Sequence, residues 1–419
     1  MTNRLISNPW LWLASVIVLT VFMWCYRRPD ALTYPQFWAE DGVIFFADAY
    51  HHGFSSLWRD HGGYYHLVPR VVALLGLSLI PLVYQPLFYN LVCLFGILAI
   101  IAYLWFRLPF SPEKKFFMAL SLTWAPVANE VMRSLAGFHF ILSLCLIIML
   151  LGRPPKNGLE WLVDLFVMVI SGLTGPFLTL FFPLLLLVAW ANKFQPKSYY
   201  ISLVIIAGLI IFPQALTLAT PSIKRFTLDQ PLTITHIIDF FNLQAIGLFF
   251  SPKWFKNGTI PPFISIIVAF AYLGGGIYFI KDVLKTRHWS TLTPLLAGLI
   301  TLSATILLYG SAIGFLNPIE GGPRYFYVPT VMILWTAILG LPQKYLRFMA
   351  VLFVYFFAFY SIAYTSKPLV DYKWPDYSSR ITTEKELNIP INPSGWFIKI
   401  RNQQVSVTKV GETNSNRQR

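Results

Sequence analysis

The sequence predicts an all-α polytopic membrane protein with about eleven transmembrane helices. Two observations predict this class. Hydrophobic residues make up 56% of the 419 residues and charged residues only 12%, and the mean hydropathy is +0.60. Hydrophobic runs that approach ~20 residues, the length that crosses a bilayer, also recur along most of the chain. A soluble protein of this length does not need so much apolar surface.

The first run, residues 9–27, is expected to be a retained span, because no small-residue cleavage site follows it. It leads into a long loop, residues 28–66, whose FFADAYHHGFSSLW stretch is expected to form an amphipathic interfacial helix. The run 161–190 is too long for one span, and its SGLTGPF turn predicts a hairpin or a sharply broken pair. The other runs are residues 70–83, 86–106, 116–128, 138–151, 200–218, 261–280, 290–310, 328–341 and 348–365.

The basic loops predict the sidedness, because Lys and Arg accumulate in cytoplasmic loops. These loops are residues 107–115, 153–156, 193–197, 281–287 and 344–347. Placing them in the cytoplasm, with the N-terminus, puts four loops outside: residues 28–66, 129–136, 219–260 and 311–327. Residues 67–83 must then dip into the membrane without crossing, and two full crossings there are the alternative. The net charge of +14 therefore reflects topology, and we expect no nucleic-acid partner.

Two regions are expected. Residues 1–366 form the transmembrane domain, and residues 367–419 form a small outer appendage with strand-like pieces (WFIKI and VSVTKV) and a disordered polar end. The three cysteines all lie in apolar runs, so we expect no disulfide framework and no metal site from them.

Glu40 and Asp41 are the first candidates for chemistry. Two adjacent carboxylates beside a membrane-spanning helix are costly and need a reason. They could simply occupy a helix N-terminus at the interface, where acidic side chains are favoured. Alternatively, each raises the pKa of the other, which suits one of them to act as a general base at the mouth of an outer cavity.

Three further groups are predicted on the same outer side. In RDHGGYYHLVPR they are Tyr65, His66 and Arg70, and an interfacial anchor is the alternative reading. In the loop after the run 116–128 they are Asn129, Glu130, Arg133 and His139. A buried pair of Glu130 with Arg133 that satisfies itself is the alternative to a re-entrant loop lining a cavity. In GFLNPIEGGPRYFYVP they are Glu320, Arg324 and Tyr325.

Arg324 is the candidate for binding a phosphate, because a guanidinium can clamp phosphate oxygens through two hydrogen bonds. An outer arginine and outer carboxylates suit sugar transfer from a lipid phosphate. The arginine stabilises the departing phosphate, and a carboxylate removes the proton of the acceptor hydroxyl. The sequence has no nucleotide-binding or Gly-rich phosphate loop, so a cytoplasmic nucleotide-sugar donor is not expected.

On FWAEDG, GGYYHLVPR, NEV, SGLTGPF and GGPRYFYVP, the chain resembles the GT-C superfamily of integral-membrane glycosyltransferases. In size and layout it is similar to the serotype-converting O-antigen glucosyltransferases. The resemblance implies a GT-C-like bundle in the bacterial inner membrane, with the active site and the C-terminus in the periplasm. The implied partners are a polyprenyl-phosphate sugar donor, most simply undecaprenyl-phosphate glucose, a lipid-linked or polymeric glycan acceptor and membrane lipids, with no metal or other cofactor.

The resemblance gives the role of base to an acidic residue of the first outer loop, Glu40 or Asp41, and places Glu130 in a second acidic loop. We predict Asp41 as the base, with Glu40 as second choice. Asn129 and His139 would accompany Glu130 near the acceptor. Arg324, Arg70 and Tyr325 would bind the donor phosphate. The rival hypothesis is a lipid-linked-sugar flippase, which would use the same headgroup site without a base.

Overall fold

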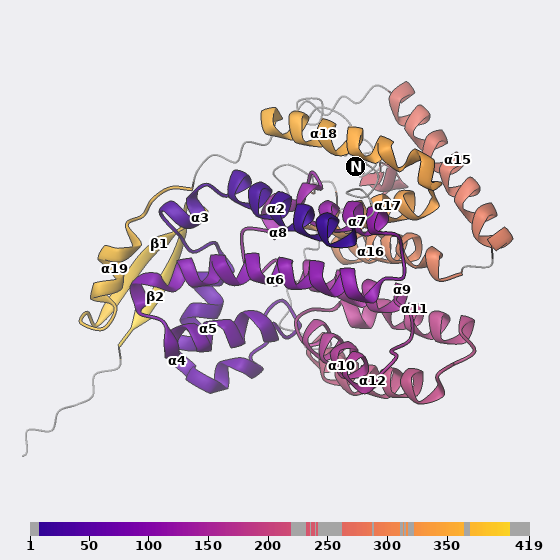
Figure 1. Ribbon diagram of the computed structural model, residues 1–419. Helices are drawn as coiled ribbons and strands as arrows, with labels where there is room; N and C mark the ends of the chain where they lie inside the picture. Colours follow the sequence, from indigo (N-terminus) through magenta and orange to yellow (C-terminus); the bar gives the residue numbers. More distant parts are fainter. Residues whose placement is uncertain are drawn as a thin grey trace, which may run out of the picture.

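The computed structural model describes residues 8–218, 232–234, 236–238, 240–241, 262–286, 289–310, 313, 316, 322–363 and 369–402. Within them the chain is mostly helical (Figure 1). The long and medium helices are α2 (Pro9–Arg27), α5 (Leu67–Leu79), α6 (Gln85–Arg107), α7 (Pro112–Trp124), α9 (Phe138–Leu151), α10 (Gly158–Gly172), α11 (Phe177–Ala191), α12 (Lys197–Leu218), α15 (Pro262–Thr286), α16 (Thr293–Tyr309), α17 (Arg324–Gly340) and α18 (Leu346–Ala363).

Short elements connect these helices. They are α3 (Asp30–Thr33), η1 (Asp41–Phe46), α4 (Ala47–His52), η2 (Gly53–Trp58), η3 (Leu82–Tyr84), α8 (Ala128–Val131), η4 (Trp289–Leu292), η6 (Gln343–Tyr345) and α19 (Trp374–Arg380). The strands β1 (Glu386–Ile391) and β2 (Trp396–Arg401) pair antiparallel, with Ile389 opposite Ile398.

Three of the helices in the described part of the chain are long and apolar enough to cross a membrane: Pro9–Arg27, Leu82–Arg107 and Lys197–Thr217. Helices α5, α9, α11 and α16 are apolar but shorter. The prediction of a helical membrane protein is therefore confirmed at this level. The count of about eleven crossings stays a prediction.

The hydrophobic runs predicted most helices to within a few residues. The first run and α2 coincide, and so do the run 138–151 and α9. The run 161–190 is divided as predicted into α10 and α11, which are joined by a short turn around Gly175. The strand at WFIKI is also confirmed, but its partner ELNIPI was not predicted, and VSVTKV lies outside the described residues.

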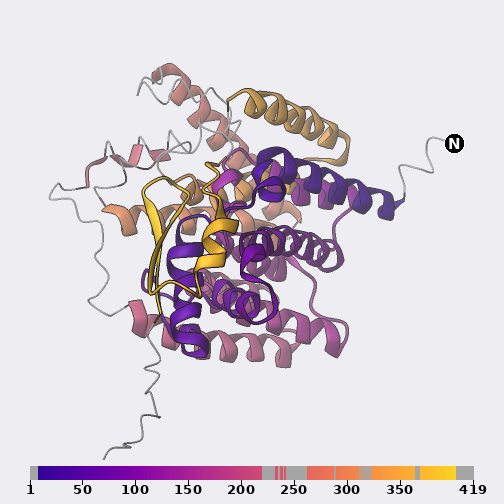
Figure 2. The same ribbon diagram turned by 90° about the vertical axis from the view of Figure 1, so that its left-hand side faces the viewer.

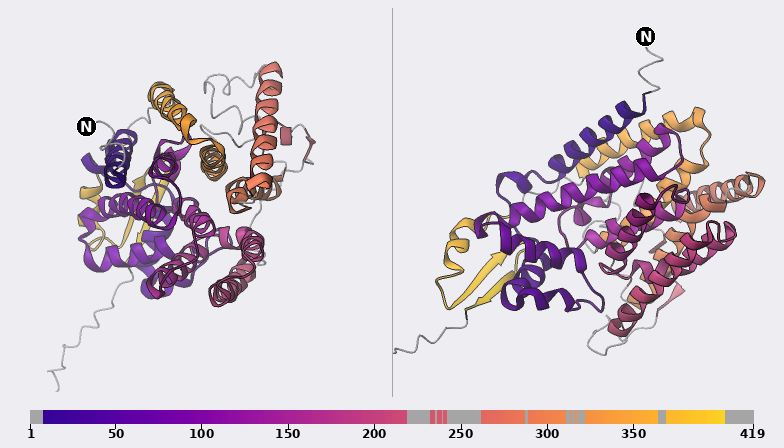
Figure 3. Two further views of the ribbon diagram at one scale, coloured as in Figure 1. Left: turned by 45° about the vertical axis from the view of Figure 1, so that its right-hand side comes forward. Right: turned by 60° about the horizontal axis from the view of Figure 1, so that its bottom comes forward.

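Among the described segments, the predicted outer loop 28–66 lies at one end of the bundle and the predicted cytoplasmic loop 107–115 lies at the other (Figure 1). At one end, Lys114 Nζ donates to the Leu339 carbonyl and Lys115 Nζ donates to the Trp105 carbonyl. At the other end, the hairpin of β1 and β2 lies against the segment 41–58, as Figures 2 and 3 show. This segregation supports the predicted grouping of the loops.

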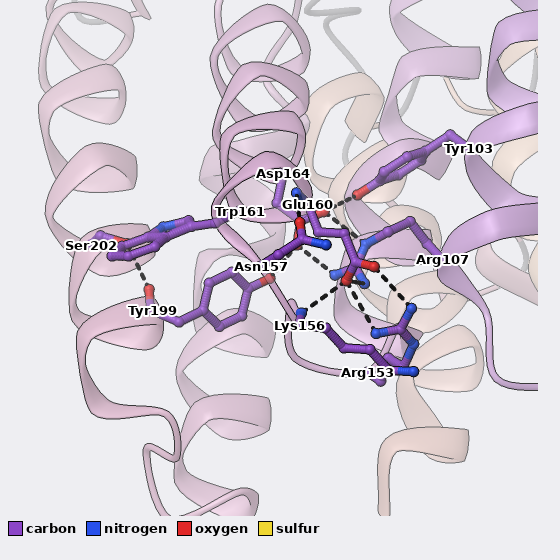
Figure 4. Close-up of polar contacts among 10 residues, drawn as sticks. All are labelled: Tyr103, Arg107, Arg153, Lys156, Asn157, Glu160, Trp161, Asp164, Tyr199 and Ser202. Atoms are coloured by element: carbon purple, nitrogen blue, oxygen red, sulfur yellow. Dashed lines mark hydrogen bonds and ion pairs between the residues drawn. The ribbon is translucent and has the colours of Figure 1, made fainter.

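A buried ion pair joins helices at the basic end (Figure 4). Asp164 in α10 is fully buried and accepts hydrogen bonds from Arg107 Nε at 2.9 Å, Tyr103 Oη at 2.8 Å and Tyr199 Oη at 2.7 Å. These donors belong to α6 and α12, so one carboxylate ties three helices together. A buried charge is tolerated only when it is paired and hydrogen-bonded in this way.

Replacing Asp164 by Asn should destabilise the protein strongly, because it leaves the Arg107 guanidinium buried without its partner. We expect a loss of about 3–5 kcal/mol in the free energy of unfolding, measured by thermal unfolding in detergent. Glu384→Gln is the control, since its side chain is 37% exposed beside the exposed Arg380, and it should cost less than about 1 kcal/mol. Equal unfolding midpoints for the two variants would contradict this account.

Candidate active site

The first predicted outer loop is held by the C-terminal hairpin. The Ala39 N–H donates to the Asn392 carbonyl, and Trp38 forms an isolated bridge with Asn392. Gly42 packs so closely on the hairpin that a Cβ there would lie 2.8 Å from Ile398 Cδ1. A side chain at this position would require the Ile391 and Ile398 side chains to shift, so glycine suits the close approach. The region after residue 366 therefore helps to position the acidic pair.

Asp41 joins the first outer loop to the second. Its side chain is 3% exposed, and its carboxylate accepts hydrogen bonds from the backbone N–H groups of Leu135 at 3.0 Å and Ala136 at 2.8 Å. Burial raises the pKa of Asp41 to about 8, although the two N–H donors lower it. The adjacent Glu40 raises it further. Each carboxylate oxygen of Asp41 thus accepts one hydrogen bond from the second loop.

A cavity of about 340 Å³ opens beside these loops, and Glu40 lines it. The neighbouring Asp41 is not among its lining residues. Arg324 and Tyr325, at the start of α17, form part of the same wall. The other lining residues are His61, Gly62, Tyr64, His66, Ala136, His139, Phe140, Pro176, Phe177, Leu180, Thr301, Ala304, Thr305, Leu308 and Tyr309.

Arg324 is the only Lys or Arg among the described residues that line this cavity. Its Nη1 lies 3.0 Å from Glu130 Oε1, and its backbone N–H donates to Glu130 Oε2 at 3.2 Å. The guanidinium also lies over the Tyr325 ring, 5.3 Å from its centroid, and it interacts electrostatically with Glu40. One oriented cation therefore faces the same space as the Glu40 carboxylate.

Imidazole and phenol rings form another part of the wall. His66 is 2% exposed, and its ring centroid lies 4.6 Å from Tyr64, 5.6 Å from His139 and 5.8 Å from His61. His139 Nδ1 lies 2.7 Å from the Ala136 carbonyl. The sequence groups around His66 and His139 therefore meet, although 73 residues separate them.

Other predicted site residues lie away from the cavity wall. Arg70 is buried and pairs with Asp48 at 3.0 Å, while Tyr65 donates its backbone N–H to Gln214. Asn129 in α8 is not a lining residue, and Glu320 lies outside the described residues. Sequence reasoning did not select Tyr309, Phe177 or Thr305, because they look like ordinary residues of apolar helices.

No family model, no curated protein and no solved structure matches this chain.

The raised pKa of Asp41 predicts a pH-dependent stability. A carboxyl group that binds its proton more tightly in the folded state stabilises the fold at low pH, and this contribution fades as the pH rises through the folded pKa. Relative to Asp41→Asn, the wild type should therefore lose stability between pH 3.8 and about 8. Thermal unfolding across this range measures the difference.

The exposed Asp376→Asn variant serves as the control and should follow the wild-type curve. Parallel curves for wild type and Asp41→Asn would show that the Asp41 carboxyl does not titrate in this range.

Proposed function

We propose that this chain is an inverting, membrane-embedded glycosyltransferase. It moves a hexose, glucose in the first instance, from undecaprenyl phosphate or a related polyprenyl phosphate to a glycan such as O-antigen on the periplasmic face of a bacterial inner membrane. The observation that carries the proposal is that Glu40 and Arg324 line one cavity, at the end of the bundle away from the basic loops. The resemblance to the GT-C superfamily gives the same reaction class.

In this reaction Glu40 removes the proton from the acceptor hydroxyl, and the acceptor oxygen forms a bond to the anomeric carbon of the donor. The bond from that carbon to the phosphate oxygen breaks on the opposite face, so the configuration inverts. The phosphate keeps the electron pair, and Arg324 stabilises its negative charge. The N-terminus of α17 adds its own favourable field for an anion at this position.

Glu40 suits the role of base better than Asp41. Glu40 faces the cavity, whereas both Asp41 oxygens accept backbone N–H groups. A base must come within hydrogen-bond reach of the proton that it removes. We therefore assign the base to Glu40 and give Asp41 the task of holding the loops around it, the reverse of the order favoured from the sequence.

Glu130 and Tyr325 orient the arginine before the donor binds. The ion pair with Glu130 fixes one edge of the guanidinium, and the side chain of Arg324 remains 32% exposed. A guanidinium has five N–H donors, so it can hold Glu130 and a phosphate oxygen together. Arg70, paired with Asp48 outside the cavity, is not included in the phosphate site of this proposal.

The cavity also reaches the apolar surface of the bundle, which suits a lipid-linked donor. Leu308 in α16 lines the cavity and is 55% exposed, and the adjacent Leu307 is 83% exposed. In a bilayer these side chains would face lipid. A prenyl chain could therefore stay among the lipids while its phosphate enters the cavity.

Glu40→Gln should abolish most sugar transfer while leaving donor binding intact. Loss of a general base lowers kcat by about 10²–10⁴-fold. The assay uses purified protein, a polyprenyl-phosphate hexose and acceptor glycan in detergent, where a flippase forms no product. Glu113→Gln, at the start of α7, is the control and should keep full activity. Wild-type transfer by Glu40→Gln would remove the proposed base.

Arg324→Gln should impair both binding and chemistry, because the guanidinium contacts the phosphate before and during bond cleavage. We expect a raised KM for the lipid donor together with a fall in kcat. An Arg324→Gln variant with unchanged kinetics would contradict the proposed phosphate site.

A further inference from the structure

The proposed mechanism leaves several polar side chains of the cavity wall unused, and His66 is the one whose ring nitrogens lack hydrogen bonds among the described residues. His66 is the last residue before α5, and its ring packs near the rings of Phe45, Tyr64 and His139. It is 2% exposed and lines the cavity. Arg324 and Glu40 serve the phosphate and the acceptor proton, so His66 is available for another part of the substrate.

Neither ring nitrogen of His66 has a hydrogen-bond partner among the described residues. The His61 carbonyl lies near the ring but not in hydrogen-bonding geometry. By contrast, His139 Nδ1 is engaged by the Ala136 carbonyl. The large majority of buried side-chain polar atoms in proteins are hydrogen-bonded. Both nitrogens of His66 are buried and unpartnered in a residue that lines the cavity, so this imidazole is placed to bind a ligand that enters beside it.

The groups around His66 determine its protonation state, and this state determines which kind of ligand the ring can bind. Burial lowers the pKa of His66 well below its usual value, and the nearby His139, His61 and Arg70 lower it further. The ring is thus neutral near pH 7 and offers one N–H donor and one acceptor nitrogen. This pattern matches hydroxyl groups, which both donate and accept. A phosphate would instead require a cation, which Arg324 provides.

We infer that His66 hydrogen-bonds hydroxyl groups of the donor hexose, so that the ring-lined wall formed by His61, Tyr64, His66 and His139 is a sugar-binding subsite next to the phosphate site at Arg324. This inference rests on the proposed function and names the part of the substrate that determines specificity. The cavity volume of about 340 Å³ falls at the lower end of the range for small-ligand sites. It suits a single sugar ring with its phosphate rather than an oligosaccharide.

The test compares the affinities of purified protein for bare polyprenyl phosphate and for its glucosyl, galactosyl and mannosyl derivatives. Wild type should bind one hexosyl lipid more tightly than the bare lipid. His66→Phe should lose this preference by about 10- to 100-fold, because two hydrogen bonds to the sugar disappear. Its affinity for the bare lipid should stay the same, which shows that the variant is folded.

Two further variants separate a role in binding from a role in packing. His66→Gln keeps a donor and an acceptor and should recover part of the preference. His52→Phe, a histidine of α4 outside the cavity, should leave the preference unchanged. Unaltered preference in His66→Phe, or a wild type that binds no hexosyl lipid more tightly than the bare one, would overturn the inference.

Failure of the proposed function has a different signature. In that case wild type forms no product from a hexosyl lipid and the acceptor glycan, whatever its binding preference among the lipids. If binding depends on Arg324 but the sugar preference is independent of His66, only the sugar subsite is wrong.

Discussion

The contact on which the candidate site depends is the pair of hydrogen bonds from the amides of Leu135 and Ala136 to the carboxylate of Asp41. Leu135 and Ala136 follow Asp41 by 94 and 95 residues in the sequence, so these bonds connect two distant loops. Because Asp41 is fixed in this way, its neighbour Glu40 is placed at the cavity. The second loop also supplies Glu130, which orients Arg324. The buried carboxylate of Asp41 thus helps to position both the proposed base, Glu40, and the proposed phosphate-binding residue, Arg324.

The C-terminal hairpin supports the same loop from the other side. Ala39 adopts a left-handed conformation, with φ of 43°, which is unfavourable for a residue with a side chain. Its N–H is bound by the Asn392 carbonyl, and Gly42 is covered by Ile391 and Ile398. The C-terminal hairpin is therefore a structural part of the candidate site, since it contacts the backbone turn at Ala39 and Gly42.

Much of this arrangement could be predicted from the sequence, because hydropathy reports the length and order of apolar helices directly. The run at residues 9–27 and the division of 161–190 are examples. The choice between Glu40 and Asp41 could not be predicted. Adjacent residues share every local signal, and only the distant amides of Leu135 and Ala136 distinguish them. The pairing of Arg70 with Asp48 could not be predicted either, because it depends on the packing of α4 against α5.

Labelling of single cysteines from each side of the membrane tests the central claim most directly. In a background without Cys25, Cys93 and Cys145, Glu40→Cys and Arg324→Cys are exposed to a membrane-impermeant maleimide in intact cells and in inverted vesicles. The account predicts that both react from outside only, that polyprenyl phosphate protects them, and that Lys115→Cys reacts only in inverted vesicles. Reaction of Glu40→Cys and Arg324→Cys from opposite sides would contradict it.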